Sequence, residues 1–167
     1  GCRYLRGGLG FGGPCFPRDN LAFQRCAEDA GAQARLSPRV VEVNDEVVHR
    51  LFAMIGEYAG PGSTVTLLGL SYKPGTHVTE ESQSVTLAAR LLDAGYQVRM
   101  HDPKALDSVA ETLGERGTCC DDPYDSVSGA SVVVVLTNWP EYGDLDMGRL
   151  EDAAGASPLL ILSLIHI

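Results

Sequence analysis

The sequence predicts an α/β protein in which a glycine-rich loop and helices lead through a long connector helix into a doubly wound, Rossmann-like parallel-sheet domain that is truncated. Three observations carry this prediction. Residues 37–59 repeat apolar side chains at steps of three and four, which predicts one long helix. From residue 64 onwards, strand-like and helix-like segments alternate, as in a βαβ series. The run VVVV at 132–135 is apolar without interruption, as is typical of a parallel strand covered on both faces.

The first part of the chain, residues 1–60, is expected to form the loop and the central helices. Residues 1–18 are rich in glycine and carry little periodicity, which indicates a loop with close backbone approaches. Pro17 suits the first turn of a helix, and Gly31 suits its end. Ser37, followed by proline, is a typical N-cap and is expected to start the connector helix. The two apolar stripes of that helix suit a connector between domains or a dimer seam.

Residues 61–161 are expected to form the α/β domain. The expected strands are 64–68, 96–100 and 130–136, with a fourth at the start of the apolar tail from residue 159, and the expected helices are 82–94 and 106–114. Residues 162–167 have no turn, cap or polar ending, and we expect a non-native tail there. The first residue is not methionine, so we also expect that upstream sequence is missing.

The composition favours a cytoplasmic protein. The chain of 167 residues has a formal net charge of −9, which argues against nucleic acid or an anionic membrane as a partner. No charged segment followed by an apolar one opens the sequence as given, so no secretory signal is expected. No apolar run reaches the 18 or so residues that span a membrane. Its five cysteines lack a zinc-type CxxC pair, and no metal site is expected.

Residues 8–13 match the pattern GxGxxG, which is found at dinucleotide-binding turns. That fingerprint follows a strand and opens directly into a helix. No strand is predicted before Gly8, and Pro14 and Cys15 interrupt the approach to the helix. We therefore do not expect NAD to bind at this turn.

Cys15 lies just before a predicted helix. Backbone N–H groups and the helix dipole favour an anion there, such as a thiolate, and Arg18 adds positive charge nearby. Asp19 follows one helical turn later, on the same side of the helix. A thiolate beside a carboxylate suits covalent acyl chemistry, in which the carboxylate orients or deprotonates water. The alternative is a buried cysteine beside a helix-capping aspartate, and the residues alone leave both interpretations open.

Three segments resemble the motifs of one enzyme family. GFGGPCFPRD at 10–19 is similar to GFGGSCFPKD, LGLSYKPGT at 68–76 resembles the start of GLAFKPNTDDVRES, and LTNWPEY at 136–142 resembles LTEWPEF. In this order, and over residues 3–150, the chain resembles the C-terminal part of a nucleotide-sugar 6-dehydrogenase of the UDP-glucose/GDP-mannose dehydrogenase family.

The resemblance implies an activity and a mechanism. Enzymes of this family oxidise the C6 hydroxyl of a nucleotide sugar to a carboxylate and use two NAD. The cysteine traps the aldehyde as a thiohemiacetal, a second hydride transfer gives a thioester, and water hydrolyses it. On this basis Cys15 is the nucleophile and Asp19 assists the attack of water.

The resemblance also implies binding residues and partners. Lys73 contacts the nucleotide sugar, Arg18 is the candidate cofactor-binding residue, and the 37–59 helix is expected to form a homodimer. NAD is expected to bind mainly to an N-terminal domain outside this chain, so the chain alone should not turn over. The loop that lets the backbone approach the sugar nucleotide contains Tyr4, Leu5, Gly8, Gly10, Phe11, Gly12 and Gly13.

The sequence departs from the family pattern within these motifs. Pro14 replaces a serine and Arg18 replaces a lysine, and we expect both changes to be tolerated. Arginine keeps the charge of lysine but not its point geometry. Glu80 stands where the family usually carries an arginine that contacts NAD, so this cofactor contact is in doubt.

Several interpretations of the function stay open. UDP-glucose is the first choice of substrate, because the cysteine segment reads Cys-Phe-Pro, whereas GDP-mannose dehydrogenases favour Cys-Leu-Pro. A UDP-N-acetylhexosamine is a third option. A non-catalytic nucleotide-binding or dimerisation module would explain Glu80 without truncation. A generic α/β domain with an unrelated thiol is the remaining alternative.

Two further polar residues stand within otherwise structural patterns. Asp102 ends a predicted strand, where a Rossmann acid binds ribose, but it is followed by proline and a turn-forming role is favoured. Asn44 lies within the apolar pattern of the connector helix. It is interpreted as a satisfied interface group, and no catalytic role is assigned to it.

Overall fold

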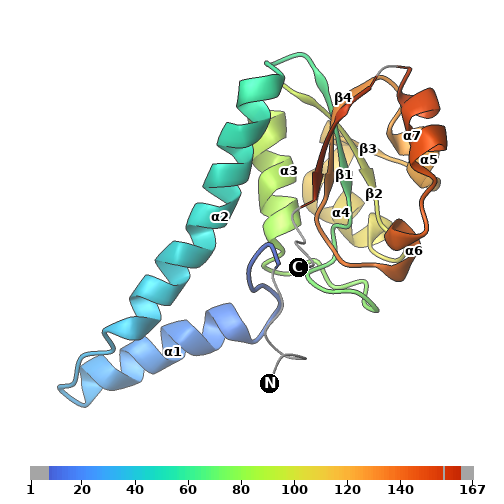
Figure 1. The fold of residues 1–167 in the computed structure, drawn as a ribbon. Coiled ribbons are helices and arrows are strands. Elements are labelled where there is room, and N and C mark those ends of the chain that lie inside the picture. Colours follow the sequence, from blue (N-terminus) through green and yellow to red (C-terminus); the bar gives the residue numbers. More distant parts are fainter. Residues whose placement is uncertain (1–7, 156, 163–167) are drawn as a thin grey trace.

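The protein is an α/β domain with a helical arm (Figure 1). In this computed structural model the described residues are 8–155 and 157–162. Within them one parallel sheet has the strand order β3-β2-β1-β4-β5. The strands are β1 (Thr64–Leu68), β2 (Gln97–His101), β3 (Thr118–Cys119), β4 (Ala130–Val135) and β5 (Leu159–Leu162). The doubly wound parallel sheet predicted from the sequence is confirmed, including its strand in the apolar tail.

The helices precede the sheet or alternate with its strands. Two come before the sheet, α1 (Phe16–Asp29) and α2 (Leu36–Tyr58). Those of the α/β domain are α3 (Gln83–Asp93), α4 (Leu106–Leu113), α5 (Pro123–Ser126), α6 (Pro140–Gly143) and α7 (Met147–Ala154), with a 3-10 turn at Gly114–Arg116. The predicted helices are confirmed to within one or two residues at their ends.

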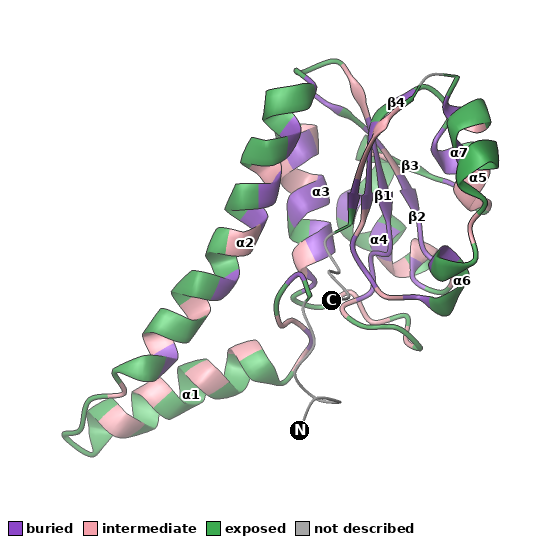
Figure 2. Cartoon of the chain, in the orientation of Figure 1, coloured by how far each residue is buried: buried purple, intermediate pink, exposed green. Residues whose placement is uncertain are grey.

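Two hydrophobic clusters hold the helices against the sheet. On one face, Leu87 and Leu91 of α3 are fully buried, and Ile55 near the end of α2 joins them. Successive strand residues point to opposite faces, so the other face of β4 packs on a second set, Val127, Trp139, Tyr142 and Leu150. Figure 2 shows buried residues concentrated in the sheet and along one side of α3. The C-terminal half of α2 is therefore part of the domain core.

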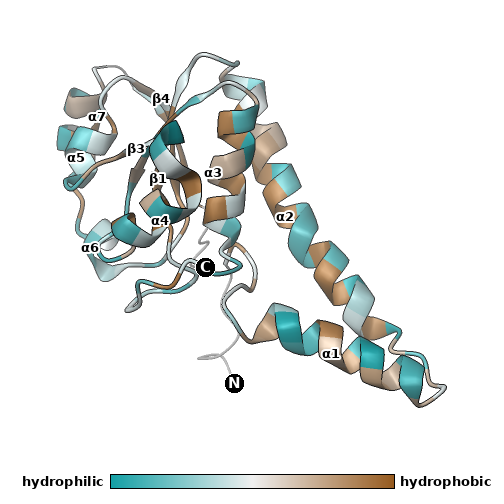
Figure 3. Ribbon diagram, turned by 180° about the vertical axis from the view of Figure 1, so that it is seen from behind, coloured by the Kyte–Doolittle hydropathy of each residue, from teal (hydrophilic) through white to brown (hydrophobic). Residues whose placement is uncertain are grey.

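The first half of α2 and all of α1 form an arm that projects away from the sheet (Figure 1). Helix α1 contains no buried residue. Apolar residues are spaced along both helices of the arm (Figure 3), and several of them are exposed: Leu21, Phe23, Leu36, Val40 and Val43. The arm therefore presents apolar surface that the described part of the chain does not cover.

Ser37 does not start α2 as predicted. The helix begins at Leu36 with Arg35 at the N-cap position, and Ser37 is buried. Its hydroxyl donates to Oδ1 of Asn20 (2.8 Å) and accepts from Nε2 of Gln24 (3.1 Å). A buried hydroxyl needs hydrogen-bond partners, and residues of α1 supply them. The Ser37 hydroxyl therefore connects α2 to α1 and does not cap α2.

Two predictions concern residues outside the described ranges. The loop residues Tyr4 and Leu5 are not described, and neither are residues 163–167 of the expected non-native tail. Leu162 is described, and it pairs with Val135 as the last residue of β5. The proposed domain boundaries and a non-native origin of the tail stay predictions.

His101 ends β2 in a buried pair with Tyr142. The Tyr142 hydroxyl donates to the carbonyl oxygen of His101 (2.9 Å). The 3.0 Å contact between the same hydroxyl and Nδ1 therefore makes the ring N–H the donor. Burial lowers the pKa of His101 below its ordinary value of 6.5, and the charge of Asp102 opposes this shift only in part.

This lowered pKa predicts a loss of stability in mild acid. The folded state keeps His101 neutral, whereas the unfolded chain takes up a proton as the pH falls below 6.5. The stabilising contribution is therefore complete above this pH and is lost as the pH falls towards the folded-state pKa. Denaturant unfolding of wild type and His101→Gln should show a difference in free energy that shrinks from about pH 7.5 to about pH 5.

The exposed His77 provides the control for this measurement. His77→Gln should follow the wild-type pH dependence. A wild-type-minus-His101→Gln difference that stays constant with pH would contradict the assignment.

Candidate functional site

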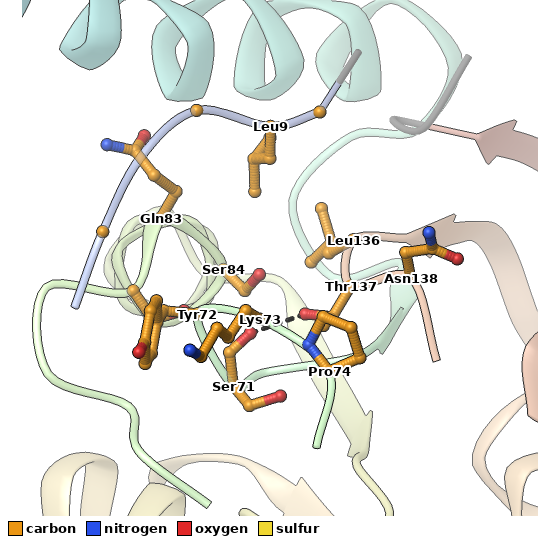
Figure 4. Close-up of a pocket in the computed structure, with 14 residues that line it drawn as sticks. Leu9, Ser71, Tyr72, Lys73, Pro74, Gln83, Ser84, Leu136, Thr137 and Asn138 are labelled. Carbon is orange, nitrogen blue, oxygen red and sulfur yellow. Dashed lines mark hydrogen bonds between the residues drawn. The ribbon is translucent and has the colours of Figure 1, made fainter. Parts of the chain in front are cut away.

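A pocket lies at the carboxyl ends of β1 and β4 (Figure 4). β1 stands between β2 and β4, so the connections that leave these ends run to opposite sides and a crevice opens between them. Ligands of doubly wound folds bind at this place. The pocket is lined by residues 71–74 after β1, 82–84 at the start of α3 and 136–138 after β4. Residues 8–13, called the glycine loop below, cover it through Gly8, Leu9, Gly10 and Gly12. Its volume is about 130 Å³, below the roughly 300 Å³ of a complete small-molecule site, so it suits one group of a larger ligand.

The N-terminus of α3 faces this pocket without a side-chain cap. Ser82 occupies the N-cap position, but its hydroxyl donates to the carbonyl oxygen of Leu70 (2.7 Å). Ser84, in the first turn, is 3% exposed and its side chain has no hydrogen-bond partner among the described residues. Figure 4 shows its hydroxyl within the pocket lining. Uncapped N–H groups and a free hydroxyl favour an anion, such as a phosphate.

Lys73 adds positive charge at the rim of the same pocket. Its side chain is exposed, and its ammonium group lies 5.4 Å from the centre of the Tyr72 ring. The predicted substrate residue therefore lies beside the uncapped helix. Among the predicted loop residues, Gly8, Gly10 and Gly12 line the pocket, whereas Phe11 and Gly13 do not.

The glycine loop is held between α2 and the segment after β1. A Cβ atom at Gly10 would overlap Oδ1 of Asn44, and one at Gly12 would overlap the carbonyl oxygen of Glu81. At Gly13, with φ of +81°, it would lie 2.6 Å from the Tyr72 ring. Close packing against the protein itself thus accounts for these glycines.

Cys15 lies at the end of this loop, at the N-cap position of α1. The thiol is exposed, and the backbone carbonyl of Cys15 accepts the first helical bond from Asp19 N (2.8 Å). The interpretation of a buried cysteine beside a capping aspartate is therefore wrong. Cys15 and Asp19 do not line the pocket beside Lys73; the glycine loop joins them to it.

Arg18 forms an ion pair with Asp19. Its Nε and Nη2 atoms both lie 3.1 Å from Oδ1 of Asp19. This hydrogen bond, followed by the charges of Asp19, Cys15 and Glu80, raises the pKa of Arg18. Both side chains are exposed, at 71% and 65%, so the pair adds little stability. It leaves Oδ2 of Asp19 without a hydrogen-bond partner in the described part of the chain.

The groove beside Arg18 does not fit a dinucleotide pyrophosphate. Arg18 shares it with three carboxylates, Asp45, Glu80 and Glu81, and like charges repel a phosphate. Glu80, the departure from the family pattern seen in the sequence, is thus one of three acidic residues in this groove. The described residues around Arg18 therefore offer no site for the pyrophosphate of NAD.

Asp102 is a structural residue. Its Oδ2 accepts from Leu70 N (2.7 Å), Ser71 N (2.9 Å), Ser71 Oγ (3.0 Å) and Trp139 Nε1 (3.2 Å). Its Oδ1 accepts from the backbone N–H groups of Lys104 and Ala105, both at 2.9 Å. The carboxylate is 2% exposed, and these bonds occupy its acceptor sites. The turn-forming role is confirmed, and a ribose contact is not available.

The described part of the chain holds neither a metal-binding cluster nor a membrane span. No group of three or more His, Cys, Asp or Glu side chains there could hold a metal ion. No helix in the described ranges is long and apolar enough to cross a membrane.

Two models of one enzyme family match parts of the chain. Residues 66–163 match the model of the UDP-glucose/GDP-mannose dehydrogenase family, UDP binding domain, and residues 1–46 match that of the family's central domain. The UDP-glucose 6-dehydrogenases of Rhizobium meliloti (strain 1021) and Pseudomonas aeruginosa are 35% and 36% identical over 96% of the chain. The chain spans 37% of the length of each of these relatives.

A solved structure is similar over nearly the whole chain. It is a UDP-glucose dehydrogenase from the archaeon Pyrobaculum islandicum, with a TM-score of 0.83 and 33% sequence identity. The match covers 95% of this chain and 39% of that one. The arm and the α/β domain therefore occur together in a known protein.

The role of Asp102 predicts a large effect of its removal on stability. Asp102→Ala leaves buried N–H groups without an acceptor, which should lower the free energy of unfolding by at least about 3 kcal/mol. Denaturant unfolding measures this, with Asp152→Ala on the exposed surface of α7 as the control. A loss for Asp102→Ala no larger than that of the control would contradict the structural role.

Proposed function

Because the chain belongs to the UDP-glucose/GDP-mannose dehydrogenase family, we propose that it forms the nucleotide-sugar part of an NAD-dependent 6-dehydrogenase that oxidises UDP-glucose to UDP-glucuronate. One observation carries the proposal: a pocket at the crossover of the sheet, lined by Lys73 and the uncapped start of α3, is joined by the glycine loop to an exposed cysteine at a helix N-terminus. The names of the relatives support UDP-glucose as the substrate.

The covalent steps belong to Cys15. Its thiolate adds to the aldehyde carbon at C6, the sulfur–carbon bond forms, and the carbonyl oxygen takes a proton to give a thiohemiacetal. The hydroxyl then gives up its proton to water and C6 gives up a hydride to the acceptor, which restores the carbonyl as a thioester. Water then adds to that carbon and the thiolate leaves, which yields the carboxylate. The acceptor is NAD, which we expect to be held mainly outside this chain.

Asp19 is proposed to assist the water. The ion pair with Arg18 uses Oδ1, so Oδ2 can accept a proton or a hydrogen bond from the attacking water. Arg18 thereby holds the carboxylate in place. We propose this role for Arg18 in place of a contact with the cofactor, because carboxylates surround it.

Cys15→Ser tests the mechanism in the complete protein that carries this chain. A hydroxyl is a poor substitute for a thiolate at neutral pH, so net formation of the acid should be abolished. The measurement is the NADH and UDP-glucuronate produced from UDP-glucose, with Cys26→Ser, exposed on the same helix, as the matched control. Full acid formation by Cys15→Ser would rule out the covalent route.

Ser84 tests the proposed phosphate position. A hydrogen bond to a charged phosphate contributes roughly 1.5–3 kcal/mol, so Ser84→Ala should weaken UDP binding by about tenfold or more. Titration calorimetry with UDP measures this. Ser131→Ala, an exposed serine in β4, should bind as wild type does. Equal affinity of Ser84→Ala and wild type for UDP would contradict a phosphate position at the N-terminus of α3.

The 37–59 helix is proposed to form a homodimer seam. Leu36, Val40 and Val43 are 80%, 46% and 57% exposed and follow one another at steps of four and three along α2. An apolar groove beside them is lined by the same helix and the glycine loop. A second copy that packs its own stripe on this surface would bury both.

Val43→Asp should disrupt this dimer, because association would bury a charge without a partner. Sedimentation equilibrium should show a shift to monomer for Val43→Asp and none for Glu46→Gln, an exposed change on the same helix. A dimer of unchanged affinity in Val43→Asp would exclude this seam.

A further inference from the structure

Asn44 is a buried amide in the middle of α2, where it is 8% exposed. Both of its polar groups bind one residue of the glycine loop. Oδ1 accepts from the backbone N–H of Phe11 (2.8 Å), and Nδ2 donates to the backbone carbonyl of Phe11 (2.9 Å). The side chain thus takes the place that the backbone of a neighbouring strand would occupy, across 33 residues of sequence.

The loop has little freedom around this amide. Gly10 has φ of +136°, and any side chain there would overlap Oδ1 of Asn44. Two residues after Phe11, Gly13 N donates to the carbonyl oxygen of Glu80 (3.0 Å). The loop is therefore fixed at two points, one on α2 and one on the segment after β1.

Cys15 follows these two points directly. Only Pro14, whose φ is restricted, separates it from Gly13. The Phe11 ring also packs against the Phe16 ring, with centroids 5.8 Å apart, and Phe16 is the first residue of α1. Phe11, which Asn44 holds, is therefore connected to Cys15 in two ways. Its backbone continues through Gly13 and Pro14 to the residue before Cys15, and its ring contacts Phe16, the residue after Cys15.

We propose that Asn44 is a positioning residue for Cys15. Its amide holds Phe11 so that the thiolate stays at the N-terminus of α1 while the loop covers the nucleotide-sugar pocket. The inference rests on the proposed function for its catalytic consequence. A purely structural amide would lower stability when lost, but would leave the reactivity of Cys15 relative to a neighbouring thiol unchanged.

The test compares Asn44→Ala and Asn44→Asp in the complete protein that carries this chain. Asn44→Asp keeps the size and one acceptor but places an oxygen against the Phe11 carbonyl, so it removes the donor with little change of shape. Glu46→Ala, exposed two residues further on α2, is the matched control. The first readout is the iodoacetamide alkylation rate of Cys15 divided by that of Cys26, measured by peptide mass spectrometry.

Cys26 is an internal reference, because it is exposed on the same helix and shares any general loosening of α1. If Asn44 sets the place of Cys15 at the N-terminus of α1, both variants should lower the Cys15-to-Cys26 ratio roughly two- to fivefold. The second readout is turnover. Misplacement of the nucleophile should lower kcat on the order of 10²-fold with KM nearly unchanged, as expected for an interaction used in the transition state.

An unchanged alkylation ratio and an unchanged kcat in folded Asn44→Asp would overturn the inference, as would a raised KM with kcat intact. Cys15→Ser in the same assay separates the two proposals. If Cys15→Ser still forms the acid, the proposed mechanism fails, and the alkylation ratio alone decides the role of Asn44.

Discussion

The buried carboxylate of Asp102 is the interaction on which the site depends. A buried charge is costly unless hydrogen bonds replace its water, and here donors from three segments do so. Those segments are the loop after β1 that leads to Lys73, the start of α4, and Trp139 after β4. Asp102 therefore holds two walls of the pocket, the loops after β1 and β4, and the uncapped N-terminus of α3 faces the space between them. The pocket is organised by a buried charge that does not itself line it.

A second constraint links the pocket to the arm. The glycine loop runs between Asn44 on α2 and the carbonyl oxygens of residues 80 and 81, so its backbone is enclosed by two elements far apart in sequence. The end of α2 that carries Ile55 is part of the domain core. Helix α2 is therefore anchored in the core at one end and binds the glycine loop through Asn44 in its middle, so it fixes the loop and Cys15 relative to the core. This explains why an exposed thiol on a projecting arm keeps a defined place relative to the sheet.

The parts of the fold with strong periodicity could be predicted from the sequence. The apolar run at 132–135 and the stripes of α2 require burial, and burial fixes their structure. The elements β3, α5 and α6 could not be predicted, because they span two to four residues and are too short to show a period. Helix α7 was not predicted either, although it is as long as the predicted α4. Ser37 has the sequence pattern of an N-cap, but its hydroxyl binds Asn20 and Gln24 of α1 instead. The sequence does not show these partners, because they become neighbours only in the folded chain. Asn44 carried a signal, a polar residue in an apolar stripe, but its partner in the loop could be found only in three dimensions.

The most direct test of the proposed covalent mechanism is the number of NADH molecules released per molecule of UDP-glucose by the complete protein that carries this chain. Oxidation of an alcohol to a carboxylate through a thioester on Cys15 requires the loss of two hydrides, so two NADH per sugar are expected. A yield of one would contradict the covalent second step. No NADH from UDP-glucose, with two per molecule of GDP-mannose, would contradict the substrate. No NADH from either sugar with a folded protein would support a binding module instead.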